Sequence, residues 1–162
     1  HDLCRRQRQM CIRDSLSPVI NPENSMNAMD KNSWILRKYF IDKWKKTIRR
    51  KIDLYNINAK EALKHKNIKS LTEYFTENFT PHSHVRDLFS AYAVTQETLN
   101  NINHDTFIYS AFDDPCVPIE PLLELEETTN VEFNALDYGG HCGFIDDFKF
   151  NSSVYHEIAK KL

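Results

Sequence analysis

The chain has 162 residues, of which 41% are apolar and 27% charged, a composition typical of one globular domain and not of a disordered or fibrous protein. The formal net charge is −2, and no apolar run approaches the roughly 18 to 20 residues that a membrane-spanning helix needs. Four cysteines without a C-x-x-C pair predict free thiols, and therefore a cytoplasmic protein, in place of a disulfide scaffold.

The first residues contain the stretch RRQRQMCIRDS, which has no hydrophobic period. It resembles the translation of a sequencing-library adaptor, so we expect residues 1–15 not to be native. Removing them takes away four of the 21 basic and two of the 23 acidic residues, which leaves 17 against 21 and a net charge of −4. The alternative, a genuine basic arm, would bind nucleic acid. Without that arm we expect no nucleic-acid partner, and we expect the natural N-terminus and any targeting signal to lie outside this chain.

The apolar stretch LSPVI is followed by NPEN, so residues 16–22 are predicted to be the end of a core strand that runs into a turn. From Ser33 the pattern turns helical. The longest predicted helix covers residues 33–52, with Ser33 as its N-cap. Its apolar positions recur every four residues, at Leu36, Phe40, Trp44 and Ile48, with Ile41 and Ile52 beside them. Its other face is basic.

Two more helices are predicted in this region, at about residues 67–79 and 85–99. The first places Leu71, Phe75 and Phe79 on one stripe, and the second would bury Leu88, Phe89 and Tyr92.

Residues 100–162 change to the pattern of an α/β core. TFIYSAF at 106–112 is a nearly continuous apolar run, as expected for a strand buried on both faces. A short helix opening at Pro118 and Pro121 follows, then a strand at 130–138, a loop, and a helix at about 152–162. The order strand, helix, strand predicts parallel strands joined by a crossover.

Polar residues follow both of these strands. Asp113 and Asp114 follow the first, and His141 follows the second in GGHCGF, which holds all three glycines of the chain. Parallel strands end at one edge of a sheet, where ligands of open α/β folds gather, so these loops should meet. A carboxylate beside an imidazole fixes the tautomer of the ring and stabilises the imidazolium that forms when it takes a proton.

Two stretches carry a family resemblance. FIYSAFDDPCVP and VEFNALDYGGHCGFIDDF resemble the acid and histidine motifs of the YheT-like branch of the α/β-hydrolase superfamily, and residues 16–148 resemble that family throughout. The resemblance implies an α/β fold, the C-terminal half of an α/β-hydrolase. Residues 16–22 and 100–162 would form the core and residues 23–99 a helical cap. It also implies Asp114 as the triad acid and His141 as the base; Asp113 is the second choice for the acid.

The family's nucleophile stands on a G-x-S-x-G-type elbow, which residues 16–162 do not contain. We therefore expect the intact enzyme to hydrolyse a small-molecule ester or lipid through an acyl-serine intermediate, without cofactor or metal. We expect this chain alone to be inactive.

Two alternatives remain at this point. Zinc could be bound by Asp114, Cys116, His141 and Cys142, although the close ligand pairs of structural zinc sites are absent. The helix at 33–52 could instead make the protein a peripheral membrane-binding module without enzymatic activity, since basic charge opposite apolar residues is typical of helices that lie in a bilayer interface. That basic charge includes Lys45, Lys46, Arg49 and Arg50.

Overall fold

The computed structural model describes residues 12–161, and these divide into two compact units. A sheet unit is formed by residues 12–20 and 94–161, and a helical unit by residues 21–93. The helical region predicted from the sequence was residues 23–99, so its bounds differ from those of the helical unit. Residues 94–99 belong to the sheet unit because the amide of Val94 donates to the carbonyl of Ile20 and Leu99 is buried against the sheet.

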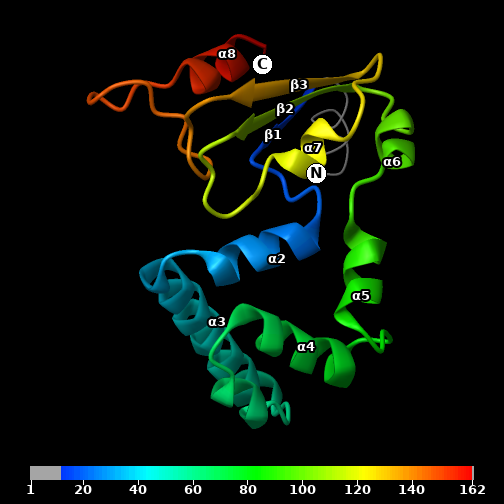
Figure 1. The fold of residues 1–162 in the computed structure, drawn as a ribbon, viewed down its shortest axis with the longest axis vertical. Coiled ribbons are helices and arrows are strands. Elements are labelled where there is room, and N and C mark those ends of the chain that lie inside the picture. The colour runs from blue at the N-terminus through cyan, green and yellow to red at the C-terminus, as the bar shows by residue number, and fades with distance from the viewer. Residues whose placement is uncertain (1–11, 162) are drawn as a thin grey trace, which may run out of the picture. The chain divides into compact units, whose positions relative to one another are not determined.

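Three parallel strands form the sheet in the order β1 (Ile12–Leu16), β2 (Asp105–Ala111) and β3 (Val131–Leu136) (Figure 1). Tyr109 of the central strand pairs with Leu16 on one side and Asn134 on the other. The prediction of an α/β class with parallel strands is confirmed. All three strands therefore end at the same edge of the sheet.

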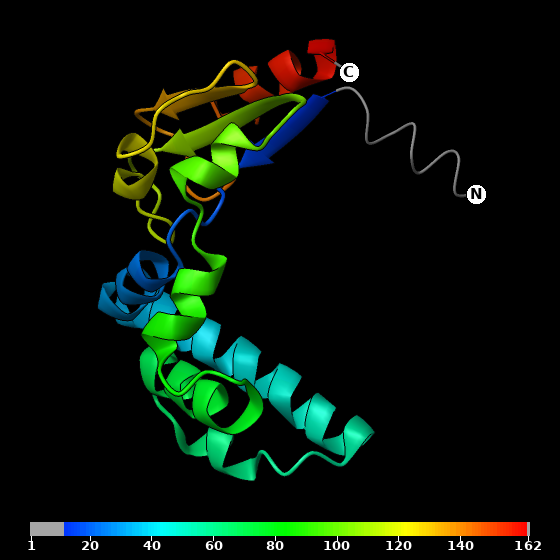
Figure 2. The ribbon, with the colours of Figure 1, turned by 90° about the vertical axis from the view of Figure 1, so that its right-hand side faces the viewer.

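Helices cover both faces of this sheet (Figures 1 and 2). Tyr109 and Ala111 face α8 (Ser153–Lys161) and pack with its Val154. Ile108, which directly precedes Tyr109 on the strand, faces the opposite way, toward α6 (Gln96–Asn100) and α7 (Glu120–Leu123). The alternation of a strand with period two thus produces a core layer on each side.

Strand β1 begins and ends earlier than predicted. It starts at Ile12, inside the segment expected to be adaptor-derived, whose residues 1–11 lie outside the described part of the chain. Pairing through backbone groups makes few demands on side chains, so residues 12–15 can complete a ladder whatever their origin. The strand stops at Leu16 and does not continue to residue 22, because Ser17 has a left-handed backbone (φ 46°) and Pro18 has no N–H to donate.

The helical unit has its own core. It consists of five helices: α2 (Pro22–Lys31), α3 (Trp34–Tyr55), the 3₁₀ helix η1 (Lys60–Lys64), α4 (Ile68–Phe79) and α5 (Val85–Tyr92). Ile41 and Ile48 of α3 are buried with Ile68 and Leu71 of α4. The predicted N-cap is confirmed, since the Ser33 side chain accepts from the amide of Leu36. No helix in the described part of the chain is both long and apolar enough to cross a membrane.

Two predictions made from the sequence about where helices begin and end are wrong. The stretch NPEN at 21–24, expected to be a turn, begins helix α2: Asn21 caps the helix by accepting from the amides of Glu23 and Asn24, and Pro22 fits its first turn. The helix expected over 85–99 is two helices, α5 and α6. Thr95 ends the run by capping α6, and Tyr92, expected to be buried, is 70% exposed.

Candidate active site

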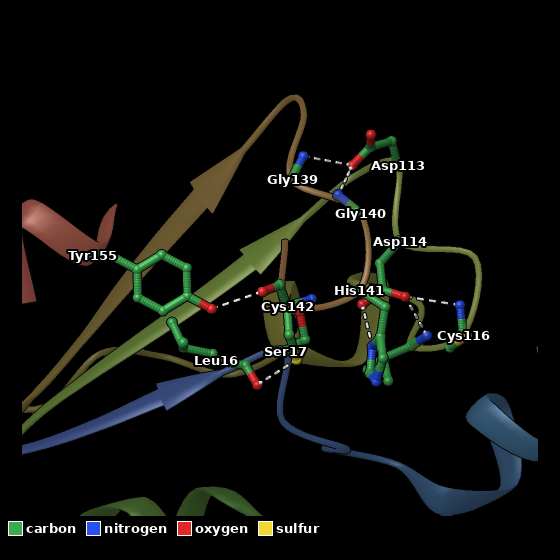
Figure 3. A network of polar contacts seen from close by, with 11 residues as sticks. Leu16, Ser17, Asp113, Asp114, Cys116, Gly139, Gly140, His141, Cys142 and Tyr155 are labelled. Atoms are coloured by element: carbon green, nitrogen blue, oxygen red, sulfur yellow. Dashed lines mark hydrogen bonds and ion pairs between the residues drawn. The ribbon is translucent and has the colours of Figure 1, made fainter. Parts of the chain in front are cut away.

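The loops after β2 and β3 meet at the carboxyl edge of the sheet (Figure 3). Nδ1 of His141 lies 3.0 Å from Oδ2 of Asp114, although 27 positions separate them. The Asp114 side chain is 2% exposed and the His141 side chain 44%. A carboxylate oxygen only accepts, so Nδ1 must carry the proton and donate it. Nε2 is then free to accept a proton from a reacting group.

The second oxygen of Asp114 is also bound. Oδ1 accepts from the amides of Cys116 at 2.8 Å and Val117 at 3.0 Å, both in the same turn (Figure 3). Both of these residues are buried. The two bonds fix the rotation of the carboxylate, and so they determine where Oδ2 points. The turn therefore orients Asp114 before Asp114 orients the imidazole.

Asp113, the second choice for the acid, has a different position. Its Oδ1 accepts from the amides of Gly139 at 2.8 Å and Gly140 at 2.7 Å. These two residues directly precede His141 in the chain, so Asp113 fixes the backbone at the start of the loop that carries the histidine. Two consecutive aspartates thus have separate tasks: Asp114 contacts the ring and Asp113 contacts the backbone that carries it.

The glycines are explained by the shape of this loop. The carbonyl of Gly139 accepts from the amides of Gly143 and Phe144, which closes residues 139–144 into a compact turn. Phe144 is 1% exposed, and a Cβ at Gly139 would lie 2.5 Å from its ring. Gly140 has φ +54°, which favours glycine. The loop therefore needs one glycine for space and one for conformation.

Cys142 anchors the other side of the histidine (Figure 3). Its amide donates to Oγ of Ser17 at 3.2 Å, its thiol donates to the carbonyl of Leu16 at 3.5 Å, and its carbonyl accepts from the hydroxyl of Tyr155 at 2.8 Å. Sequence reasoning missed Ser17 and Tyr155. Ser17 directly follows β1 and Tyr155 lies in α8, and nothing local in the sequence links them to residue 142. His141 is thus held between two anchored neighbours.

The contact from α8 can be tested by replacing Tyr155 with phenylalanine. Tyr155 is 44% exposed, and the change removes only the bond to the Cys142 carbonyl. We expect a loss of about 1 kcal/mol in the free energy of unfolding and faster hydrogen exchange of the Cys142 and Gly143 amides. Tyr138, which is 81% exposed, provides the control: Tyr138→Phe should alter neither quantity. Unchanged exchange in Tyr155→Phe would show that the bond does not hold the loop.

Three of the four candidate metal ligands also lie together. One ligand atom each of Asp114, Cys116 and His141 falls within 4.8 Å of the others, whereas the thiol of Cys142 is directed to the Leu16 carbonyl. Burial, and then the electrostatic interactions with Asp114 and Cys142, raise the pKa of the Cys116 thiol. Both oxygens of the Asp114 carboxylate already accept hydrogen bonds, from the amides of Cys116 and Val117 and from Nδ1 of His141. The described contacts of this cluster are therefore those of a carboxylate–imidazole pair.

The same pKa shift predicts an order of thiol reactivity. Because the thiolate is the nucleophile and the pKa of Cys116 is raised, Cys116 should be alkylated by iodoacetamide more slowly than a free cysteine at pH 8, and its rate should keep rising as the pH is raised further. Asp114→Asn removes one of the charges that raise this pKa, so Cys116 should become more reactive. Peptide mapping by mass spectrometry measures both rates. Faster alkylation of Cys116 than of Cys142 at pH 8 would contradict the account.

Comparison of the chain with protein-family models, with curated proteins and with solved structures found no match.

Proposed function

We propose that this chain carries the acid and base of a serine hydrolase that acts on carboxylic esters, in a YheT-like α/β-hydrolase arrangement. The observation that supports it most strongly is the buried Asp114 carboxylate, which is bound by two backbone amides on one oxygen and by Nδ1 of a half-exposed His141 on the other. The pair lies where parallel strands end, the usual position for chemistry in open α/β sheets. The sequence resemblance supplies the reaction class.

In this proposal His141 moves the proton in both halves of the reaction. Its Nε2 takes the proton of a serine hydroxyl while the serine oxygen attacks the ester carbonyl, and then gives that proton to the leaving alcohol as the ester C–O bond breaks. In the second half Nε2 takes a proton from a water molecule while the water oxygen attacks the acyl-serine carbonyl. It then returns that proton to the serine oxygen as the acyl–serine bond breaks and the carboxylic acid is released. Asp114 stabilises the imidazolium formed in each half and keeps Nε2 directed outward.

The serine would be supplied by sequence that this chain does not contain. Its three glycines stand at 139, 140 and 143, so no G-x-S-x-G elbow is present. Ser17 superficially resembles a nucleophile, since it follows a strand and has φ 46°. However, it is 4% exposed and its Oγ accepts from the Cys142 amide. We assign it to loop support and not to attack on a substrate.

A fluorophosphonate probe tests this division of roles. We expect no stoichiometric labelling of this chain, because loss of a nucleophile alone removes several orders of magnitude of reactivity. The same probe should label a polypeptide in which the encoded upstream sequence is restored, and His141→Gln should abolish that labelling. Stoichiometric labelling of a serine in the present chain would contradict the assignment of Ser17. Labelling of the restored enzyme that persists in His141→Gln would contradict the role of His141.

Compartment and partners follow as parts of the same proposal. The described cysteines, Cys116 and Cys142, are free thiols, which fits a reducing cytoplasm. The substrate would be a small-molecule ester or lipid.

The charge of α3 supports a second candidate, peripheral contact with an anionic membrane. The helix has eight lysines and arginines against two aspartates, and Trp34, Ile35 and Tyr39 near its start are more than half exposed. Its apolar stripe cannot lie as a whole in a bilayer, since Ile41 and Ile48 are buried in the core of the helical unit. Membrane contact would therefore use the basic outer side of the helix and not the amphipathic mode suggested by its sequence.

Co-sedimentation with phosphatidylserine vesicles tests this candidate. Reversing the charges of Lys46, Arg49 and Arg50, all exposed, together with the half-buried Lys45, should abolish binding. Because salt screens exposed charges, the unmodified protein should bind the vesicles more weakly in high salt than in low salt. Unchanged binding of the charge-reversed protein would eliminate the candidate.

A further inference from the structure

An apolar groove lies within the helical unit, between α3 and α4. It consists of two adjoining cavities of about 410 and 220 Å³, both of which are lined by Ile48, Lys51 and Phe75. Trp44 lies along the first cavity, and Phe79 along the second. The shared residues make the two cavities one continuous surface. Its size falls in the range of sites that hold small organic molecules.

The lining is apolar except at Thr47 and Lys51. Thr47 contributes a hydroxyl, but that group already donates to the Lys43 carbonyl. Lys51 contributes the only charged group among the lining residues, and it forms no ion pair with any described residue. No carboxylate lines either cavity. An apolar channel with one unpaired cation is complementary to a molecule that has an apolar chain and one negative charge.

The surrounding charge favours the same ligand. Helix α3 has a net charge of +6, from eight basic and two acidic side chains. One of those acids, Asp42, is already bound by Lys38, and its pKa is lowered mainly by that bond. This net positive charge on the helix that forms one wall of the groove attracts anions and accelerates their approach. A neutral or cationic lipid would gain nothing from this field.

We propose that this groove binds a single-chain anionic amphiphile, such as a fatty acid, with its chain along Trp44, Ile48 and Phe75 and its head group at Lys51. Trp44 and Phe79 are 38% and 44% exposed, and the acyl chain would cover them. Each additional buried methylene contributes about 0.8 kcal/mol, so two more carbons should tighten binding roughly tenfold until the groove is full. The site lies entirely within residues 21–93 and does not depend on the role of His141.

The two tryptophans of the chain provide a direct test. Trp34→Phe leaves Trp44 as the only tryptophan, and Trp44→Phe leaves the exposed Trp34, which does not line the groove. A bromine-substituted fatty acid, kept below its critical micelle concentration, should quench Trp44 saturably in the first variant and leave Trp34 unquenched in the second. Circular dichroism of both variants shows whether the helices are intact.

Charge is tested in the Trp34→Phe background. Lys51→Glu should weaken binding of the bromo acid at least fivefold and leave the matching bromo alcohol unaffected. Lys46→Glu makes the same change in net charge at a lysine outside the groove, and it should weaken the acid less than twofold. Equal quenching of the two tryptophans, equal affinity for acid and alcohol, or equal effects of the two lysine variants would overturn the proposal. Vesicle binding that is lost in Lys46→Glu, without quenching of Trp44 by the soluble acid, would overturn it in favour of a membrane surface.

Discussion

Replacing Asp114 with alanine is expected to lower the free energy of unfolding of the sheet unit by about 3–5 kcal/mol. The change removes an acceptor from three groups, and it leaves the amides of Cys116 and Val117 without a partner in a buried turn. Each such loss costs roughly 1–3 kcal/mol, which places Asp114→Ala among the most damaging single substitutions. Urea denaturation followed by near-ultraviolet circular dichroism measures the change.

Asp114→Asn is the matched control for that measurement. Asparagine keeps one oxygen for the two amides, so we expect a cost of only about 1 kcal/mol. It should nonetheless fail as an orienting group. In an enzyme completed by its nucleophile, turnover should fall about 10⁴-fold, because the imidazole loses the correct tautomer. Equal destabilisation by alanine and asparagine would show that Oδ1 does not support the turn.

Gly139→Ala should also cost about 2–3 kcal/mol, because its Cβ would lie 2.5 Å from one atom of the Phe144 ring and 3.0 Å from Cβ of Ala111. The ring cannot move easily, since it is 1% exposed and packed against the sheet. Gly140→Ala is the comparison. A Cβ at this position would have no neighbouring atom within 4 Å, so only the left-handed φ should lower the free energy of unfolding, by roughly 1–2 kcal/mol.

Thermal unfolding of the two glycine variants separates these causes. Gly139→Ala should be rescued in part by Phe144→Leu, which makes room for the added methyl group. Gly140→Ala should gain nothing from Phe144→Leu, and a common rescue of both would show that space is not what requires the first glycine.

Much of the sheet unit could be predicted from the sequence because its signals are local. A continuous apolar run predicted β2, and a second strand separated from it by a proline-opened helix predicted parallel pairing. From those two elements it followed that Asp114 and His141 would lie near each other. Which of two consecutive aspartates contacts the ring could not be decided from spacing, since both precede the same turn.

Other features depend on contacts that no local pattern reveals. Ser17 is 125 positions from Cys142, and Tyr155 is 13 positions from it, in α8. Two helix starts show the opposite case, in which the signal was present and was missed. Asn21 and Pro22 form an ordinary start to α2, and Thr95 an ordinary cap to α6, but apolar periodicity extended across Thr95 and joined two helices into one.

The hydrogen bond from His141 to Asp114 is the central claim, and the tautomer of the ring tests it most directly. In the chain labelled with ¹⁵N-histidine, with His141→Gln used to assign the signal, nuclear magnetic resonance should show neutral His141 protonated on Nδ1. That proton should exchange slowly, and in Asp114→Asn it should lose this protection. A neutral His141 protonated on Nε2, or a ring whose spectrum is the same in both proteins, would contradict the assignment of Asp114 and His141 as the working pair.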